Sequence, residues 1–96
     1  MSAALALDGE LNIYRAAELK QDLLAAVAAT PALELDLSGV SELDTAGLQV
    51  LMLAKQAANA LGHELHLRRH SAAVLEVFEL LDLGAWFGDA LSTVSQ

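Results

Sequence analysis

The chain of 96 residues has the length of one domain, and its 55% hydrophobic and 19% charged residues exclude intrinsic disorder. Thirteen acidic and five basic side chains give a net charge of −8, which makes nucleic acid and anionic membrane surfaces poor partners. The absence of cysteine excludes disulfides, thiolate metal sites and cysteine nucleophiles. We therefore expect a single domain over residues 1–96 that works in the cytoplasm and binds no nucleic acid.

The first half of the chain is predicted to hold a hairpin, a helix and a strand. Residues 3–7 and 11–13 form the two strands of the hairpin, with Asp8-Gly9 as its turn. Apolar residues at helical spacing predict a helix over residues 15–29, and Pro31 follows its end. Leucine alternates with acidic residues over residues 33–37, which predicts a strand. The longest uncharged apolar stretch has about half of the roughly 20 residues that a membrane-spanning helix needs, so no span is expected.

The second half is predicted to continue with helices and strands in alternation. A polar connection over residues 38–44 leads into a helix over residues 45–61, which Gly62 ends. Residues 64–68 alternate again and predict a strand. Ser71 is expected to cap a third helix that ends near Gly84, and residues 86–87 are expected to close the sheet edge as a short strand. Strands that are linked through helices imply parallel crossovers, so the fold class is α/β.

Motifs of common enzymes are missing from the sequence. It has no glycine-rich phosphate loop, no G-x-S-x-G and no histidine pair within a predicted helix, so we expect neither catalysis nor a metal or other cofactor. His63, His66 and His70 flank a predicted strand and are interpreted as surface residues. The basic cluster formed by Arg68, Arg69 and His70 could meet an acidic partner or a phosphate, and a solvated strand end explains it equally well.

The segment from Asp44 to Leu48 is the most informative part of the sequence. Either Asp44 or Thr45 can cap the following helix, because both side chains can accept from the free N–H groups of its first turn. The same place would tolerate a phosphate on Thr45, since those N–H groups and the positive end of the helix dipole favour negative charge. Ala46 and Gly47 are small and leave the hydroxyl accessible, and glycine is a poor helix residue. Spacing alone favours the plain cap.

These residues resemble the STAS domain family, named for sulfate transporters and anti-sigma factor antagonists. The run Asp44-Thr45-Ala46-Gly47-Leu48 is similar to the family's Asp-Ser/Thr-x-Gly-Leu signature, and residues 9–14 and 35–40 resemble its second and central strands. The resemblance implies the STAS fold, a small mixed sheet of about four or five strands with an N-terminal hairpin and with helices mainly on one face. Few residues follow Ala90, so the C-terminal helix of the family is expected to be short or missing.

The resemblance also implies a function. In the anti-sigma factor antagonists of this family, a histidine-kinase-like serine/threonine kinase that is also the anti-sigma factor phosphorylates the residue after the signature aspartate, which ends binding. Carried over, Thr45 is the phosphorylation site and Asp44 orients its hydroxyl. The chain would then be a bacterial anti-anti-sigma phosphoprotein that controls transcription through partner switching in signal transduction. Related modules bind without phosphorylation, either to the transport ATPase of lipid-transport ABC complexes or within chemotaxis-associated signalling clusters, and this alternative stays open.

A docking surface is predicted around Thr45. The outward stripe of the following helix is uncharged and includes Met52 beside Leu53, which suits a docking face, although single exposed apolar residues are common without any partner. Acidic residues close to Thr45, among them Asp36 and Glu42, would attract a basic partner and raise its association rate. The expected partner-binding residues are Ser38, Gly39, Ser41, Glu42, Asp44, Thr45, Ala46, Gly47, Gln49, Met52 and Leu53.

Overall fold

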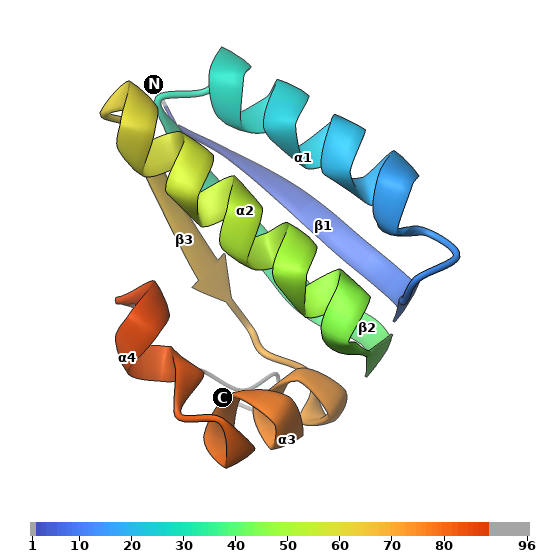
Figure 1. Ribbon diagram of the computed structural model, residues 1–96. Helices are drawn as coiled ribbons and strands as arrows, with labels where there is room; N and C mark the ends of the chain where they lie inside the picture. Colours follow the sequence, from blue (N-terminus) through green and yellow to red (C-terminus); the bar gives the residue numbers. More distant parts are fainter. Residues whose placement is uncertain (1, 89–96) are drawn as a thin grey trace.

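Three parallel strands in the order β1-β2-β3 form the sheet within residues 2–88, the part of the chain that the computed structural model describes. Helices α1 and α2 lie side by side on one face of this sheet (Figure 1). The elements along the chain are β1 (Ser2–Leu11), α1 (Ala16–Ala29), β2 (Ala32–Leu43), α2 (Thr45–Leu61), β3 (Glu64–Arg68), α3 (Ala72–Leu80) and α4 (Leu83–Phe87). The predicted α/β class is confirmed.

The core lies between the sheet and the helices and is built mainly from leucine. The alternation in β2 directs Leu33, Leu35 and Leu37 toward the helices, where each is buried. Glu34 and Asp36 point to the opposite face and remain at least partly exposed. Buried side chains on each of the other elements complete this core, among them Leu7, Leu11, Leu19, Leu23, Val27, Leu48, Leu51, Leu65, Leu67, Val74, Phe78 and Phe87.

The predicted N-terminal hairpin is wrong. β1 is one continuous strand that pairs in parallel with β2 from Ser2 to Leu11. Gly9 does have the positive φ of a turn residue, 75°, but shifts of register around Asp8 and Gly9 absorb it as an irregularity within the strand. Because the strand continues, both Leu7 and Leu11 are buried. The sheet of residues 2–88 therefore has three parallel strands in place of a mixed sheet of four or five.

β2 is longer than predicted, because it continues through the expected polar connection to Leu43. Its second half pairs with the end of β1, where Asp8 aligns with Gly39 and Leu11 with Leu43. A side chain at position 39 would meet the Cβ atom of Asp8 at 2.8 Å, so glycine permits the close approach of the two strands here. The extra length of β2 carries the chain to Asp44, at the start of α2.

Three predicted elements agree closely with the structure. α1 begins one residue later than predicted and ends at the expected Ala29. α2 has the predicted bounds, and Gly62 ends it in the left-handed conformation with φ 72°. β3 spans the predicted residues and pairs with the first half of β2 only. α3 packs against β2 as well (Figure 1).

The C-terminal part differs from the prediction. Ser71 caps α3 as expected, since its Oγ accepts from the N–H of Val74 at 3.3 Å, but the helix ends at Leu80. Gly84 lies inside α4, and residues 86–87 are helical instead of forming an edge strand. The ring of Phe87 stacks on that of Phe78 with centroids 5.1 Å apart, which places this segment in the core. The expected short helix after Ala90 lies outside the described residues.

Candidate functional site

Thr45 is the first residue of α2, and its side chain is exposed. The preceding Asp44 has extended backbone angles and is the N-cap of the helix. Its Oδ1 accepts from the N–H of Gly47 at 2.9 Å, and its carbonyl oxygen accepts from the N–H of Leu48 at 2.9 Å. Of the two predicted capping candidates, Asp44 therefore fills the role, and the hydroxyl-bearing side chain of Thr45 faces solvent.

Asp44 also connects α2 with the end of β1. Its second carboxylate oxygen, Oδ2, accepts from the N–H of Ile13 at 3.1 Å, and its own N–H donates to the carbonyl oxygen of Leu11 at 3.1 Å. One carboxylate thus holds two segments that lie 31 positions apart in the sequence. The β1–α1 loop, residues 12–15, is part of the site for this reason, although no pattern in the sequence places it there.

Gly47 is needed because α2 approaches β1 closely at this point. A Cβ atom at position 47 would collide with the carbonyl oxygen of Leu11 and lie 2.8 Å from its carbonyl carbon. Gly47 is buried, as is Leu48, which extends the signature into the core. The structure thus explains why the motif needs an aspartate, a glycine and a leucine at these spacings.

The other predicted partner-binding residues lie on the second half of β2 and along α2. Gly39, Ser41, Glu42 and Gln49 are exposed, as Thr45 is. Residues that are only half-buried are Ser38, Asp44, Ala46, Met52 and Leu53, and Met52 packs partly against the core. The predicted residues therefore lie on two successive elements, and those nearest to Thr45 along the chain are at the end of β2 and in the first turn of α2.

The expected acidic cluster of Asp36, Glu42 and Asp44 is not formed. Asp36 lies opposite Arg68 in the β2–β3 register, whereas Glu42 lies six residues further along the same strand, which corresponds to roughly 20 Å. Asp36 instead forms an ion pair with Arg69 at 4.0 Å on the outer face of the sheet. Arg68 similarly pairs with Glu34 at 3.5 Å, so acidic residues of β2 neutralise the basic strand end.

The Ser38 N–H donates to Oδ1 of Asp36 at 2.9 Å, and hydrogen bonds from Ser38 hold the pKa of Asp36 below its ordinary value of 3.8. Because the pKa of Asp36 is lower in the folded state, its carboxylate stabilises the protein at pH values above 3.8. This stabilisation is lost as the pH falls through the folded-state pKa. We therefore expect Asp36→Asn to reduce the free energy of unfolding more at pH 7 than near pH 3. Urea unfolding at the two pH values measures this difference, and an equal loss at both would contradict the role of Asp36.

The histidines do not behave alike. His70 is buried, with its ring edge-on to Phe78 at 5.5 Å between centroids, so its prediction as a surface residue is wrong. His63 and His66 are partly exposed, and Nδ1 of His63 lies 2.9 Å from the carbonyl oxygen of Val27. Among residues 2–88 no three His, Asp or Glu side chains are grouped so as to hold a metal ion, and no pocket is found.

The chain matches the family model described as "Mlab, STAS domain" over residues 1–92 and therefore belongs to the STAS domain family. None of the curated proteins matches it. Within the described part of the chain, no helix combines the length and the apolar character that crossing a membrane requires.

Solved structures with the same fold include regulators and a transporter domain. An anti-sigma factor antagonist from Mycobacterium paratuberculosis has a TM-score of 0.79 at 25% identity, covering 94% of this chain and 75% of that one. SpoIIAA, a Bacillus anti-sigma factor antagonist solved in its unphosphorylated form, has a TM-score of 0.75 at 20% identity, covering 96% and 80%. The STAS domain of a SulP transporter from Vibrio cholerae has a TM-score of 0.73 at 17% identity, covering 96% and 73%.

Proposed function

We propose that this chain is a non-enzymatic, cytoplasmic regulatory module, one domain over residues 1–96, that binds a protein partner through the surface around the start of α2. Phosphorylation of Thr45 controls this binding. The observation that supports the proposal is the exposed Thr45 at the first position of α2, next to an Asp44 that already caps the helix. Membership of the STAS family and the likeness to anti-sigma factor antagonists support the class of function.

A phosphate on Thr45 would change the surface more than the fold. It adds a charge of about −1.5 to −2, and the first turn of a helix offers N–H groups that have no acceptor within the helix. Asp44 takes the N–H of Gly47, and its carbonyl takes that of Leu48, so the cap does not depend on Thr45. The phosphate therefore leaves the helix start intact and places a dianion where a partner has to approach.

The proposed partner is a histidine-kinase-like serine/threonine kinase that acts as an anti-sigma factor. The unmodified chain binds this kinase and releases the sigma factor, and phosphorylated Thr45 ends the binding through charge repulsion and desolvation at the interface. In this scheme the chain is a bacterial anti-anti-sigma factor that promotes transcription. The two oxygen atoms of the Asp44 carboxylate make their hydrogen bonds without Thr45, which leaves its hydroxyl open to the kinase.

A second candidate function uses the same surface without phosphorylation. The module would then be a constitutive subunit that grips the ATPase of a lipid-transport ABC complex, or a component of a chemotaxis-associated cluster. The observation that favours it is the uncharged side of α2, where Gln49 is exposed and Met52 and Leu53 are half-buried, since such a stripe suits a permanent contact.

Both candidates are tested by isolating the tagged full chain from its host and identifying, by mass spectrometry, the bound proteins and any phosphate on Thr45. A kinase-like ATPase together with phosphorylated Thr45 supports the first function. A transport ATPase with its permease and an unmodified Thr45 supports the second and contradicts the first.

With the identified partner purified, we expect Thr45→Glu to weaken binding at least about tenfold, because it adds a charge at the interface. Thr45→Ser is the matched control, since it retains the hydroxyl, and we expect it to bind within about threefold of the wild type. Position 45 is exposed, so the melting temperatures of the two variants should agree with that of the wild type. Unchanged binding of Thr45→Glu would contradict a partner surface at the start of α2.

A further inference from the structure

We infer that the β1–α1 loop, residues 12–15, presents Ile13 and Tyr14 as an apolar anchor for the same protein that binds around Thr45. The partner would receive Tyr14 in an apolar pocket bordered by lysine or arginine side chains. This inference rests on the proposed function and extends it by naming the part of the surface that gives affinity. Three observations carry it: the exposure of the two side chains, the fixed conformation of the loop, and the acidic residues around it.

Both side chains are unusually open to solvent for their size. Tyr14 is 92% exposed and Ile13 is 67% exposed. A single exposed apolar residue is common on protein surfaces and carries no meaning by itself. Ile13 and Tyr14, however, are two large exposed side chains next to each other on a short loop, so they differ from a single exposed residue. Tyrosine is also among the residues that contribute most to binding at protein interfaces.

Hydrogen bonds fix the backbone of this loop. Oδ1 of Asn12 accepts from the N–H of Tyr14 at 3.1 Å, and the carbonyl oxygen of Asn12 accepts from the N–H of Arg15 at 3.0 Å. Oδ2 of Asp44 accepts from the N–H of Ile13 at 3.1 Å. Three consecutive N–H groups thus have acceptors, and the loop holds its side chains outward before any partner arrives.

Arg15 adds a second constraint on the same loop. Its Nη1 donates to the carbonyl oxygens of Asp8 at 2.7 Å and of Glu10 at 3.0 Å, which ties the end of the loop to β1. A loop that is ordered in advance loses little conformational entropy on binding, and a tyrosine side chain has few torsions to immobilise. The loop is therefore suited to give affinity at low entropic cost.

The loop and Thr45 form one surface. The carboxylate of Asp44 contacts the N–H of Ile13, and Thr45 is the next residue after Asp44. Figure 1 shows the β1–α1 loop and the start of α2 at the same end of the molecule. A protein that covers Thr45 therefore reaches Ile13 and Tyr14 as well. A phosphate on Thr45 would place its charge close to this anchor.

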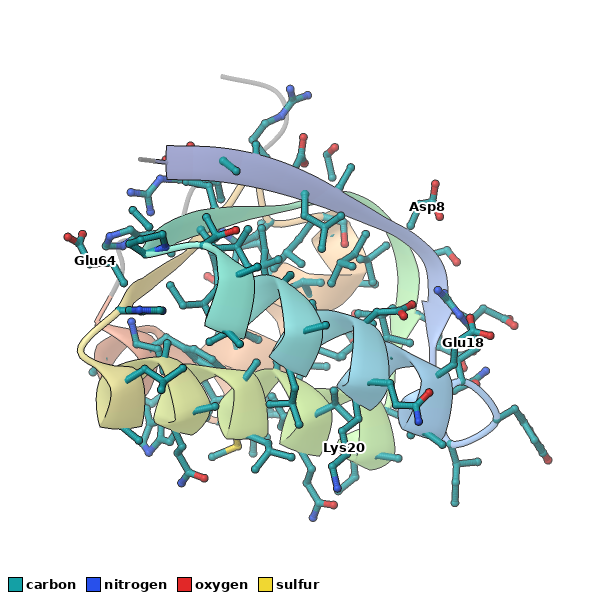
Figure 2. All side chains as sticks on the ribbon, turned by 90° about the horizontal axis from the view of Figure 1, so that it is seen from above. Asp8, Glu18, Lys20 and Glu64 are labelled. Carbon is teal, nitrogen blue, oxygen red and sulfur yellow. The ribbon has the colours of Figure 1, made fainter. Side chains whose placement is uncertain are left out.

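Apart from Arg15, the charged residues on the elements next to the anchor are mainly acidic, which indicates the chemistry of the partner. Glu10 and Glu42 are register partners on neighbouring strands, and both are exposed. Asp8 and Glu18 lie at the same side of the molecule (Figure 2) and are exposed as well. Complementarity then calls for basic residues around the pocket that receives Tyr14.

The test uses a photo-crosslinking amino acid, p-benzoylphenylalanine, placed singly at positions 14, 49 and 80 of the full chain in its host. Position 49 reports on the surface beside Thr45, and Leu80, which is 80% exposed on α3, is the matched control away from it. We expect positions 14 and 49 to crosslink to the same protein and position 80 not to do so.

Each pattern of crosslinks has a distinct meaning. Crosslinking at 49 without 14 would overturn the anchor and leave the proposed function standing. Crosslinking at 14 without 49 would contradict the proposed surface around α2, and no crosslink at either position would contradict both. Equal crosslinking of one protein at 14 and 80 would also overturn the inference, because the contact would not be confined to this surface.

The protein captured at position 49 is then purified and titrated with variants of the chain. We expect Tyr14→Ala to weaken binding at least about tenfold, Tyr14→Phe to remain within about threefold, and Leu80→Ala to leave binding unchanged. Raising the salt concentration from about 50 to about 500 mM should slow association, since screening weakens attraction between the acidic surface and a basic rim. Unchanged affinity of Tyr14→Ala overturns the anchor, and a salt-independent association rate overturns the basic rim.

Discussion

Replacing Gly47 with alanine is expected to lower the free energy of unfolding by about 3 kcal/mol, because the new methyl group would collide with the carbonyl of Leu11. The result is informative because alanine favours a helix over glycine by about 1 kcal/mol, so helix propensity alone would raise the stability. The loss corresponds to a fall of about 12–24 °C in melting temperature for a domain of this size. Urea unfolding and calorimetry measure both quantities.

Gly62→Ala provides the comparison. Gly62 has a φ of 72°, and a Cβ atom there would meet nothing within 4 Å, so the only cost is the left-handed backbone, about 1 kcal/mol. We expect Gly47→Ala to be clearly the more damaging of the two. If the two variants lost equal stability, or if Gly47→Ala were stabilised, the close contact between α2 and β1 would not exist in solution.

The second large effect is expected for Asp44→Ala, which should reduce the free energy of unfolding by about 2–3 kcal/mol. The substitution removes the cap on Gly47, worth about 1 kcal/mol, and a second charged hydrogen bond from the N–H of Ile13. We also expect the amide protons of residues 13 and 47 to exchange faster with solvent. Chemical unfolding at pH 7 and hydrogen exchange measure the two consequences.

Two variants separate the cap from the connection to the loop. Ser71→Ala removes a cap that bonds the N–H of Val74 alone, so it should cost about 1 kcal/mol, less than Asp44→Ala. Asp44→Asn retains an oxygen that accepts from the N–H of Gly47 but turns an NH₂ group toward the N–H of Ile13. Its loss of unfolding free energy should lie between the losses of Asp44→Ala and Ser71→Ala. Equal losses for Asp44→Ala and Ser71→Ala would show that the bond to Ile13 contributes nothing.

The sequence was sufficient where local patterns decide the structure. The bounds of α2 follow from its apolar stripe, from a capping residue at Asp44 and from Gly62 at its end, all of which lie within the helix or next to it. The alternation in β3 and the cap at Ser71 are local signals of the same kind. The predictions at these places were confirmed because no distant contact competes with the local preference.

The hairpin prediction was wrong because a local turn signal competed with contacts between residues that are far apart in the sequence. Asp8-Gly9 favours a turn, but parallel pairing with β2 and the burial of Leu7 and Leu11 favour a continuous strand. The same reason applies to His70, whose burial depends on Phe78 in α3, and to Ser38-Gly39, which looks like the start of a loop until β1 pairs with it.

The candidate site was predicted in part. Asp44, Thr45 and Gly47 could be placed at a helix start from the sequence, and the structure adds that Asp44 is the cap and that Thr45 is exposed. Ile13 was missed because its connection is a hydrogen bond between residues 31 positions apart, for which the sequence has no pattern. An asparagine followed by two large apolar residues was the available signal, and alone it suggests only a turn.

The bond between Asp44 and Ile13 makes the candidate surface a property of the folded chain. In parallel pairing, Ser2 meets Ala32 and Ala32 meets Glu64, so each pair of strands comes together only across an intervening helix. Before the sheet has formed, the surroundings of the Thr45 hydroxyl do not differ from those of other serine and threonine hydroxyls in an unfolded chain. A partner that contacts Thr45 and Ile13 together therefore distinguishes folded molecules from unfolded ones, and a kinase that requires both would not modify an unfolded chain.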